Sequence, residues 1–305
     1  MDAAQIARLR SFNRTVSQRI GALDDRFLDR GRPLGEARLL YEIGHGGAEV
    51  RALRARLELD SGYVSRLLRS LERQRLVTGE RAAGDGRVRR VRLTAKGRRE
   101  VAELDRRADA FARSMLAPLG AAQQARLIAA MTEVERLMRA SAVRIAAEPA
   151  DSADARWCVA QYFRELGRRF DAGFDPARSI SADAHELTPP AGVFVIARLG
   201  GRPIGCGALK VKQRRIGEVK RMWVDAEARG LGIGRRLLAA LEAEARKFGL
   251  GTLRLETNRS LVEAQALYRR AGYREVAPFN DEPYAHHWFE KRLRPARTGS
   301  WHESR

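Results

Sequence analysis

Apolar residues recur at helical spacing along the first part of the chain, from Ile6, Leu9 and Phe12 onward. This spacing is typical of an amphipathic helix with one buried face. Pro33 suits the first turn of a second helix, and Asp60 has the short polar side chain that caps a helix start. The pattern predicts helices over residues 3–28, 33–43 and 48–57, and a fourth helix that begins at residue 61.

After the fourth helix, the helical spacing of apolar residues gives way to an alternation of apolar and polar residues. Residues 76–81 are expected to form a strand, and the Gly-Asp-Gly sequence at 84–86 suits the tip of a hairpin. Residues 88–93 alternate apolar and basic side chains and would return as the second strand. Thr94 would then cap a long helix that runs to about Leu116. This order of elements is that of a mainly α winged helix-turn-helix domain.

The fourth helix offers the first candidate for nucleic-acid contact. Its apolar positions share one face, so the opposite face would present short polar and basic side chains. Such a face suits the major groove of DNA, although an ordinary solvated face is the alternative. The 12 basic and 3 acidic side chains between residues 61 and 99, in a chain of net charge +20, favour DNA. The candidate contacts on this helix are Ser61, Tyr63, Ser65, Arg66 and Arg69.

The hairpin and its flanks resemble a known family. The sequence from Asp85 to Gly97 is similar to the wing signature of MarR regulators, and the resemblance covers most of residues 1–146. It implies that Arg87, supported by Asp85, enters the minor groove of double-stranded DNA, since a narrow groove favours inserted arginine. It also implies that Arg89 and Arg90 contact phosphates. MarR regulators are dimeric, so a homodimer is implied, built from the helices at 3–28, 95–117 and 121–146.

Strands and helices mix in the second part of the chain. Strands are expected over residues 194–197, 203–210, 217–224 and 253–258. The clearest boundary between the two patterns is the stretch at residues 147–153, which has small and polar residues and one proline. The sequence therefore predicts two domains, at 1–146 and 154–294, with a linker at 147–153 and a disordered tail at 295–305.

A glycine-rich turn precedes a helical pattern in the second domain. Arg229 leads it, and Gly230, Gly232 and Gly234 follow. Backbone N–H groups and the positive end of the helix dipole at such a turn bind phosphate oxygens. The turn lacks the Lys-Ser/Thr of a Walker loop, and it comes too late in its domain for a dinucleotide fingerprint. The Arg-x-x-Gly-x-Gly pattern resembles the pyrophosphate loop of GNAT acetyltransferases.

This second resemblance extends over residues 154–294. It implies an α/β GNAT acyltransferase fold with a mixed central sheet and acetyl-CoA as co-substrate. A strand that ends at Asn258 and a helix that holds Tyr268 occur in the family's order. The residues implied to bind acetyl-CoA are Met222, Val224, Arg229, Gly230, Leu231, Gly232, Ile233, Gly234, Arg235, Asn258 and Tyr268.

The same resemblance implies transfer of an acetyl group to a primary amine by direct attack. Backbone amides near Met222 and Val224 would polarise the thioester carbonyl, and Tyr268 would protonate the leaving thiolate. Glu218 on the third strand and Glu256 on the fourth are the two candidate bases. The structural alternatives are a packed aromatic ring for Tyr268 and a solvated or salt-bridged strand carboxylate for Glu218 and Glu256.

The acceptor is less well defined by the sequence. Residues 279–288 are polar and aromatic and are expected to line the acceptor pocket, where Asp281 and Glu282 would suit a cationic amine. A small molecule and a protein lysine are both open alternatives. An early helix carries three arginines that would either hold an acceptor carboxylate or face solvent: Arg164, Arg168 and Arg169.

Other classes of function find no support in the sequence. Cys158 and Cys206 show no metal-ligand spacing, so no metal is expected. The chain shows neither a secretory signal pattern nor an apolar run of membrane-spanning length, so we expect a cytoplasmic protein without a membrane partner. The combined prediction is a DNA-binding transcriptional regulator that is also an N-acetyltransferase. The alternative is a regulator whose second domain senses acetyl-CoA or another ligand without catalysis.

Overall fold

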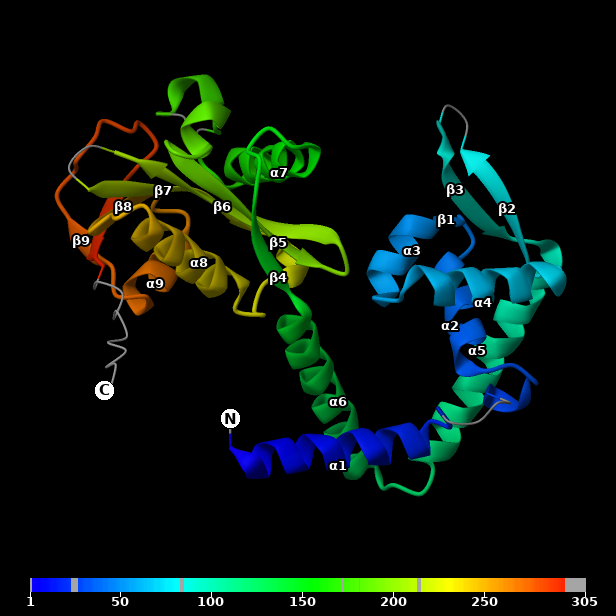
Figure 1. Ribbon diagram of the computed structural model, residues 1–305. Coiled ribbons are helices and arrows are strands. Elements are labelled where there is room, and N and C mark those ends of the chain that lie inside the picture. The colour runs from blue at the N-terminus through cyan, green and yellow to red at the C-terminus, as the bar shows by residue number, and fades with distance from the viewer. Residues whose placement is uncertain are drawn as a thin grey trace, which may run out of the picture. The chain divides into compact units, whose positions relative to one another are not determined.

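The chain divides into two compact units, Met1–Thr132 and Glu133–Arg305, in the computed structural model (Figure 1). The structure describes residues 2–22, 27–82, 85–171, 173–180, 182–212 and 215–293, and between 81 and 89 it describes the backbone alone. Helix α6 (Ala121–Ala142) runs across the boundary between the units.

The N-terminal unit packs helices against a small antiparallel sheet. Its strands lie in the order β1, β3, β2, and β2 and β3 form a hairpin. Two short helices followed by α4, the hairpin and the long helix α5 are the elements of a winged helix-turn-helix, as predicted. The bounds are α1 (Ala3–Arg19), η1 (Phe27–Asp29), α2 (Leu34–Ile43), β1 (Ala48–Glu49), α3 (Val50–Leu57), α4 (Ser61–Arg73), β2 (Val77–Ala82), β3 (Asp85–Leu93) and α5 (Ala95–Leu116).

Two helix starts in this unit confirm caps that the sequence predicts. The Asp60 carboxylate accepts a hydrogen bond from the Tyr63 N–H at 2.9 Å and begins α4. The Thr94 hydroxyl accepts from the Gly97 N–H at 3.0 Å and begins α5. Helix α4 buries one face and leaves the other to solvent. The buried side chains are Val64, Leu67, Leu68 and Leu71.

The first helix is shorter than its sequence pattern predicts. Helix α1 ends at Arg19, although the apolar spacing indicates a helix to residue 28. Gly21 has φ +66°, a left-handed conformation that glycine adopts without strain and that commonly follows a helix end. Two apolar side chains of α1, Ile6 and Leu9, are 45% and 56% exposed.

The C-terminal unit is built on one seven-stranded sheet in the order β4, β5, β6, β7, β8, β10, β9. Neighbouring strands are antiparallel except β7 and β8, which are parallel, so the predicted mixed sheet is confirmed. The strands are β4 (Arg144–Glu148), β5 (Gly192–Leu199), β6 (Arg202–Val211), β7 (Ile216–Val224), β8 (Thr252–Thr257), β9 (Arg274–Val276) and β10 (His287–Arg292). The helices are α7 (Ala153–Arg169), η2 (Pro176–Arg178), η3 (Ala184–Leu187), η4 (Ala226–Ala228), α8 (Ile233–Lys247) and α9 (Val262–Arg270).

Helices cover both faces of this sheet (Figure 1). Alternate residues of β5 divide between two cores, with Val193 and Val195 packed in the core of α8, and Phe194 and Ile196 in the core that includes Cys158 of α7. Burial on both faces explains why β5 is apolar along most of its length. Helix α9 packs on the same side as α8, through Tyr268.

The sequence pattern predicts a helix to residue 146 and a linker from residue 147, whereas helix α6 ends at Ala142 and a strand follows it. Residues 144–148 form β4, which pairs with β5 from Arg144↔Arg198 to Glu148↔Phe194. The Arg236 guanidinium donates to the carbonyl oxygens of Ala140 and Val143 and so caps the end of α6. The small residues of this stretch gave no strand signal in the sequence, because the pairing partner lies far along the chain.

No helix in the part of the chain that the structure describes is long and apolar enough to cross a membrane. The same residues contain no group of three or more His, Cys, Asp or Glu side chains that could hold a metal ion. Cys158 and Cys206 are both buried and unbridged.

Candidate active site

The glycine-rich turn begins α8 with two glycines in the left-handed region. Gly230 has φ +77° and Gly232, the N-cap residue, has φ +72°. Because Gly232 provides no side-chain cap, the first N–H groups of α8 are left for an outside partner. A Cβ added at either glycine would meet no atom within 4 Å. Open space therefore lies where an anion would approach this helix end.

This space belongs to a groove of about 780 Å³, a volume typical of small-molecule sites. Of the residues predicted to bind acetyl-CoA, two lie outside it: Leu231 packs against the core, and Asn258 lines a second pocket. The predicted residues that line the groove are Met222, Val224, Arg229, Gly230, Gly232, Ile233, Gly234, Arg235 and Tyr268.

Glu165, which the sequence alone did not single out, contacts two of the arginines that line the groove. Both oxygens of Glu165 on α7 lie 2.5 Å from Nη2 of Arg229. Glu165 also accepts a hydrogen bond from Trp223 Nε1 at 3.0 Å, and Arg169 Nη1 lies 3.5 Å away. Glu165 thereby fixes Arg229 at the groove wall.

Strand β7 separates from β8 beside the groove. The two strands pair only over Ile216–Glu218, and among the described residues the rest of that edge has no strand partner. Arg221 has φ +57° where the register with β6 shifts, which marks a β-bulge. Met222 and Val224, whose backbone amides the sequence predicts to polarise the thioester carbonyl, lie on this splayed part of β7.

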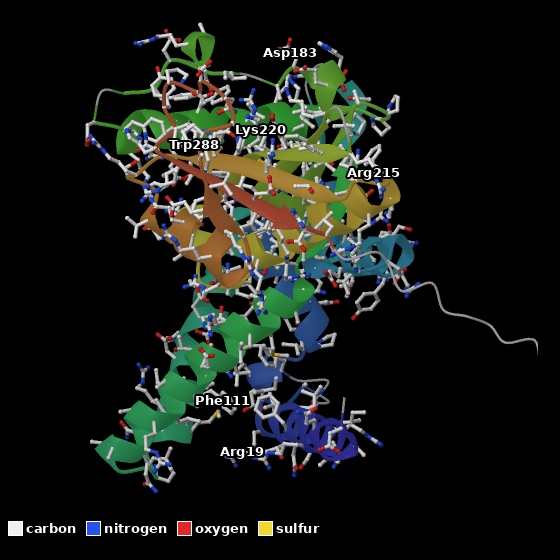
Figure 2. The ribbon with its side chains drawn as sticks, turned by 90° about the vertical axis from the view of Figure 1, so that its left-hand side faces the viewer. Arg19, Phe111, Asp183, Arg215, Lys220 and Trp288 are labelled. Atoms are coloured by element: carbon white, nitrogen blue, oxygen red, sulfur yellow. The ribbon has the colours of Figure 1, made fainter. Side chains whose placement is uncertain are left out.

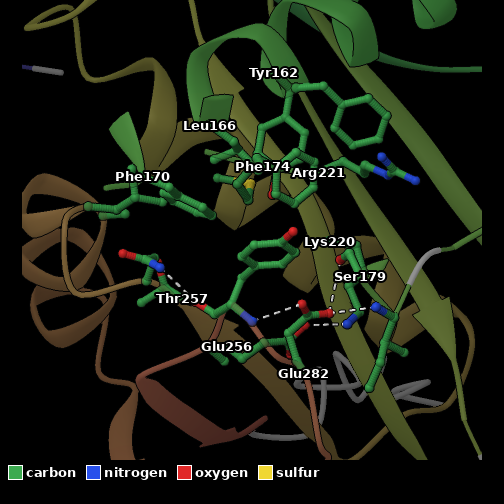
Figure 3. Close-up of a pocket in the computed structure, with 18 of the residues that line it drawn as sticks. Tyr162, Leu166, Phe170, Phe174, Ser179, Lys220, Arg221, Glu256, Thr257 and Glu282 are labelled. Carbon is green, nitrogen blue, oxygen red and sulfur yellow. Dashed lines mark hydrogen bonds and ion pairs between the residues drawn. The ribbon is translucent and has the colours of Figure 1, made fainter. Parts of the chain in front are cut away.

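A second pocket of about 100 Å³ adjoins the groove (Figure 3). Figure 3 shows Tyr162, Phe170 and Phe174 on one side of it and Lys220 and Glu282 on the other. The two cavities share six lining residues, so each opens toward the same point. The shared residues are Tyr162, Leu166, Met222, Leu261, Ala264 and Tyr268.

Both candidate bases contact one lysine. Lys220 lies over the middle of the sheet (Figure 2), where its Nζ contacts Glu256 Oε1 and lies 3.6 Å from Glu218 Oε2. Glu256 lines the second pocket, and its Oε2 is buried without a hydrogen-bond partner among the described residues. Glu218 lines neither cavity. Burial raises the pKa of the Glu256 carboxyl, while Lys220 opposes that effect.

Tyr268 on α9 and Asn258, which follows β8, both line the second pocket. Tyr268 on α9 is buried, and its ring centroid lies 5.8 Å from that of Phe289. Burial raises the pKa of its phenol, which therefore keeps its proton at neutral pH. Asn258 donates to the Tyr284 carbonyl at 2.8 Å and accepts from the Ser260 N–H at 2.9 Å. These two bonds hold the turn that follows β8.

Part of the segment at 279–288 reaches the second pocket. Glu282, Tyr284 and Ala285 line it, whereas Asp281 lines neither cavity. Glu282 accepts from the Ser179 hydroxyl at 2.9 Å and the Ile180 N–H at 2.7 Å, so it anchors the loop at 179–180. Among the three arginines predicted on the early helix, Arg169 lines the groove, and Arg164 and Arg168 line neither cavity.

The N-terminal unit presents a basic face on α4. Arg66 and Arg69 are exposed, and the guanidinium of Arg66 lies 5.7 Å from the Tyr63 ring centroid. Arg90 is exposed on β3. Ser61 is exposed and Ser65 is half-buried on the same helix. The side chains of Asp85, Arg87 and Arg89 lie outside the described residues, so their roles stay predictions, as does the homodimer.

Known proteins resemble both units. Residues 159–273 match the family model described as Acetyltransferase (GNAT) family, and residues 30–88 match the MarR family. An IAA acetyltransferase from Azospirillum brasilense is 40% identical over 127 residues, which are 41% of this chain and 82% of that protein. The uncharacterized N-acetyltransferase YsnE of Bacillus subtilis is 36% identical over 35% of this chain and 72% of that protein. A solved acetyltransferase of the GNAT family from Staphylococcus aureus is 19% identical, has a TM-score of 0.44 and covers 50% of this chain and 100% of that one.

The chain belongs to the GNAT acetyltransferase family. A MarR-type segment precedes its GNAT domain, so the protein is a fusion of the two. GNAT enzymes use acetyl-CoA, and the groove fits that molecule in two respects. Gly230 and Gly232 form a cradle that a Cβ would fill, and helix α8 directs its uncapped end there.

Sequence reasoning missed several residues that line the groove and the second pocket. Lys220 lies two positions after Glu218 on β7, so the period of a strand was a signal that could have linked them. Glu165, Phe170 and Phe174 come from a helix and a loop that meet the site only through the fold. No local pattern marks these three as neighbours of β7.

Proposed function

We propose that the protein is a DNA-binding regulator that also transfers the acetyl group of acetyl-CoA to a primary amine. The observation that supports the transfer is the junction of the two cavities. One cavity has the open cradle of Gly230 and Gly232, the other contains the Glu256 carboxylate, and Tyr268 and Met222 line both. A donor and an acceptor bound in these cavities would meet at Tyr268.

Acetyl-CoA, when bound, supplies the acetyl thioester. The N–H groups at the start of α8 and the Arg229 guanidinium would bind its pyrophosphate, because a helix N-terminus and a cation both favour phosphate oxygens. Arg229 would exchange contacts with Glu165 for contacts with phosphate. The splayed edge of β7 near Met222 would hold the thioester carbonyl oxygen.

Two side chains of the pocket would move the protons. Glu256 would take a proton from the acceptor ammonium, with Lys220 and Glu218 positioning its carboxylate. The amine nitrogen then bonds to the acetyl carbon while the carbon–sulfur bond breaks, and the nitrogen releases its second proton to solvent. Tyr268 would give its proton to the leaving sulfur and regain one from solvent or from Glu256. The products are an N-acetyl amine and free CoA.

Replacing Gly232 with valine is expected to weaken acetyl-CoA binding about tenfold or more, because the side chain would fill the cradle. Gly249 offers a matched control. It also has a positive φ, +70°, with no atom within 4 Å of an added Cβ, and it lies outside the groove. Titration calorimetry with acetyl-CoA should separate G232V from G249V, and equal affinities for the two variants would contradict the assigned cradle.

The DNA-binding part of the proposal rests on the exposed basic face of α4. Arg66 and Arg69 lie opposite the buried side of the helix, and Arg90 is exposed on the wing strand β3. Cations arranged in this way bind duplex DNA by releasing its counterions. The MarR-type segment matches residues 30–88, which include this helix.

Arg69→Ala is expected to weaken duplex binding and to flatten its salt dependence by about one in the log–log slope, the effect of one lost phosphate contact. Arg106→Ala removes an arginine of α5 that is 66% exposed and paired with Glu103, and it should leave the slope unchanged. Fluorescence anisotropy with a mixed-sequence duplex at several salt concentrations measures both. Duplex binding that is absent or insensitive to salt would contradict this part of the proposal.

A further inference from the structure

The second pocket, which would hold the acceptor, has an aromatic wall with the ring of Phe174 at its centre. Phe174 lies in ring contact with three others, at centroid distances of 5.4 Å to Phe163, 5.8 Å to Phe170 and 4.9 Å to Tyr284. Tyr162 on α7 lines the same pocket. Tilted and edge contacts at these distances are those that aromatic rings prefer, so the wall would favour another flat ring.

The loop that carries Phe174 is fastened over the pocket by polar contacts. The Asp175 N–H donates to the Tyr284 hydroxyl at 3.0 Å. The Glu282 carboxylate accepts from Ser179 and Ile180 farther along the same loop. These bonds account for Glu282 without a substrate, so the cationic group of an acceptor needs another partner.

Glu256 provides that partner. Its side chain is 9% exposed, Oε1 contacts Lys220, and the buried Oε2 has no hydrogen-bond partner among the described residues. Buried polar atoms nearly always have a partner, so an unsatisfied carboxylate oxygen in a pocket indicates a donor supplied from outside. An ammonium group is the donor that a carboxylate binds most strongly.

We infer that the acceptor is a small arylalkylamine, a primary amine with an aromatic ring on a short aliphatic stem. Its ammonium group donates to Glu256 Oε2, and its ring packs against Phe174 and the rings around it. This inference rests on the proposed acetyl transfer. A lysine side chain has an ammonium group and an aliphatic stem, and it offers no ring to this wall.

The test compares three acceptors with the full chain and acetyl-CoA: 2-phenylethylamine, the saturated 2-cyclohexylethylamine and a lysine-containing peptide. We expect kcat/KM for the aromatic amine to exceed those for the other two by about tenfold. Phe174→Leu should bring the ratio of aromatic to saturated amine close to one. Phe279→Leu, a loop phenylalanine that lines neither cavity, should leave that ratio as it is. Acetyl-CoA affinity shows whether each variant is folded.

The outcomes separate this inference from the proposed function. CoA release that is fastest with the lysine peptide, or equal for the two matched amines, would overturn the acceptor class and leave the transferase function intact. A ratio unchanged in a folded F174L variant would also overturn it. An absence of release with every amine, despite acetyl-CoA binding, would overturn both.

Discussion

Changing Glu256 to glutamine is expected to lower kcat by a factor of about 10² to 10⁴, the usual contribution of a positioned general base. Glutamine keeps the shape of the side chain and cannot accept the ammonium proton. Glu290→Gln is a matched control, because Glu290 lies on the neighbouring strand β10 and pairs with Arg254 outside both cavities. Release of CoA at saturating amine measures kcat for both variants.

The pH profile gives this prediction a second readout. Burial, with Glu218 and Glu282 nearby, raises the pKa of Glu256 above 4.5, while Lys220 lowers it. A base must be deprotonated to act, so kcat should rise with pH through this raised pKa, and the rise should be absent in E256Q. A wild-type level of kcat in E256Q, or the same rising limb in both proteins, would shift the assignment of the base to Glu218 or to water.

Changing Tyr268 to phenylalanine is expected to lower kcat by about 10²-fold or more, because the leaving thiolate would lose its proton donor. The raised pKa of Tyr268 keeps the phenol protonated in the neutral range. Acetyl-CoA affinity should change little, since Phe fills the same space at the junction of the cavities. Single-turnover kinetics would show whether the loss lies in the chemical step.

Tyr273→Phe is the matched control for this variant. Its ring centroid lies 6.1 Å from that of Tyr268, in the same core, and it lines neither cavity. Removal of its hydroxyl should leave kcat unchanged. If Y268F kept the turnover of Y273F, Tyr268 would be a packing residue, which is the alternative that its burial also allows.

Much of the architecture follows from local signals. Asp60 and Thr94 are caps that a short polar side chain before an apolar stripe predicts, and both form as expected. The glycine-rich turn was recognisable because glycine tolerates the left-handed backbone that Gly230 and Gly232 adopt. These features depend on a few consecutive residues, and so sequence alone determines them.

The features that sequence reasoning missed depend on distant partners. Strand β4 has small residues without alternation, and it is a strand because β5 pairs with it. The early end of helix α1 is an exception with a local cause, because Gly21 adopts φ +66° two residues after the last helical residue. The aromatic wall joins α7 with loops at 174 and 284 that are far apart in the chain. Glu256 lines the second pocket and Glu218 does not. Their positions in the sequence do not show which of the two carboxylates faces a cavity.

Acetyl transfer by this protein is best tested by the release of free CoA from acetyl-CoA, measured with the full chain across a panel of amines and with no amine added. We expect release that depends on the acceptor, follows saturation kinetics and yields one N-acetyl amine for each CoA. Binding of acetyl-CoA without release above the no-amine rate for any acceptor would contradict it. The groove would then serve as a ligand-binding site alone.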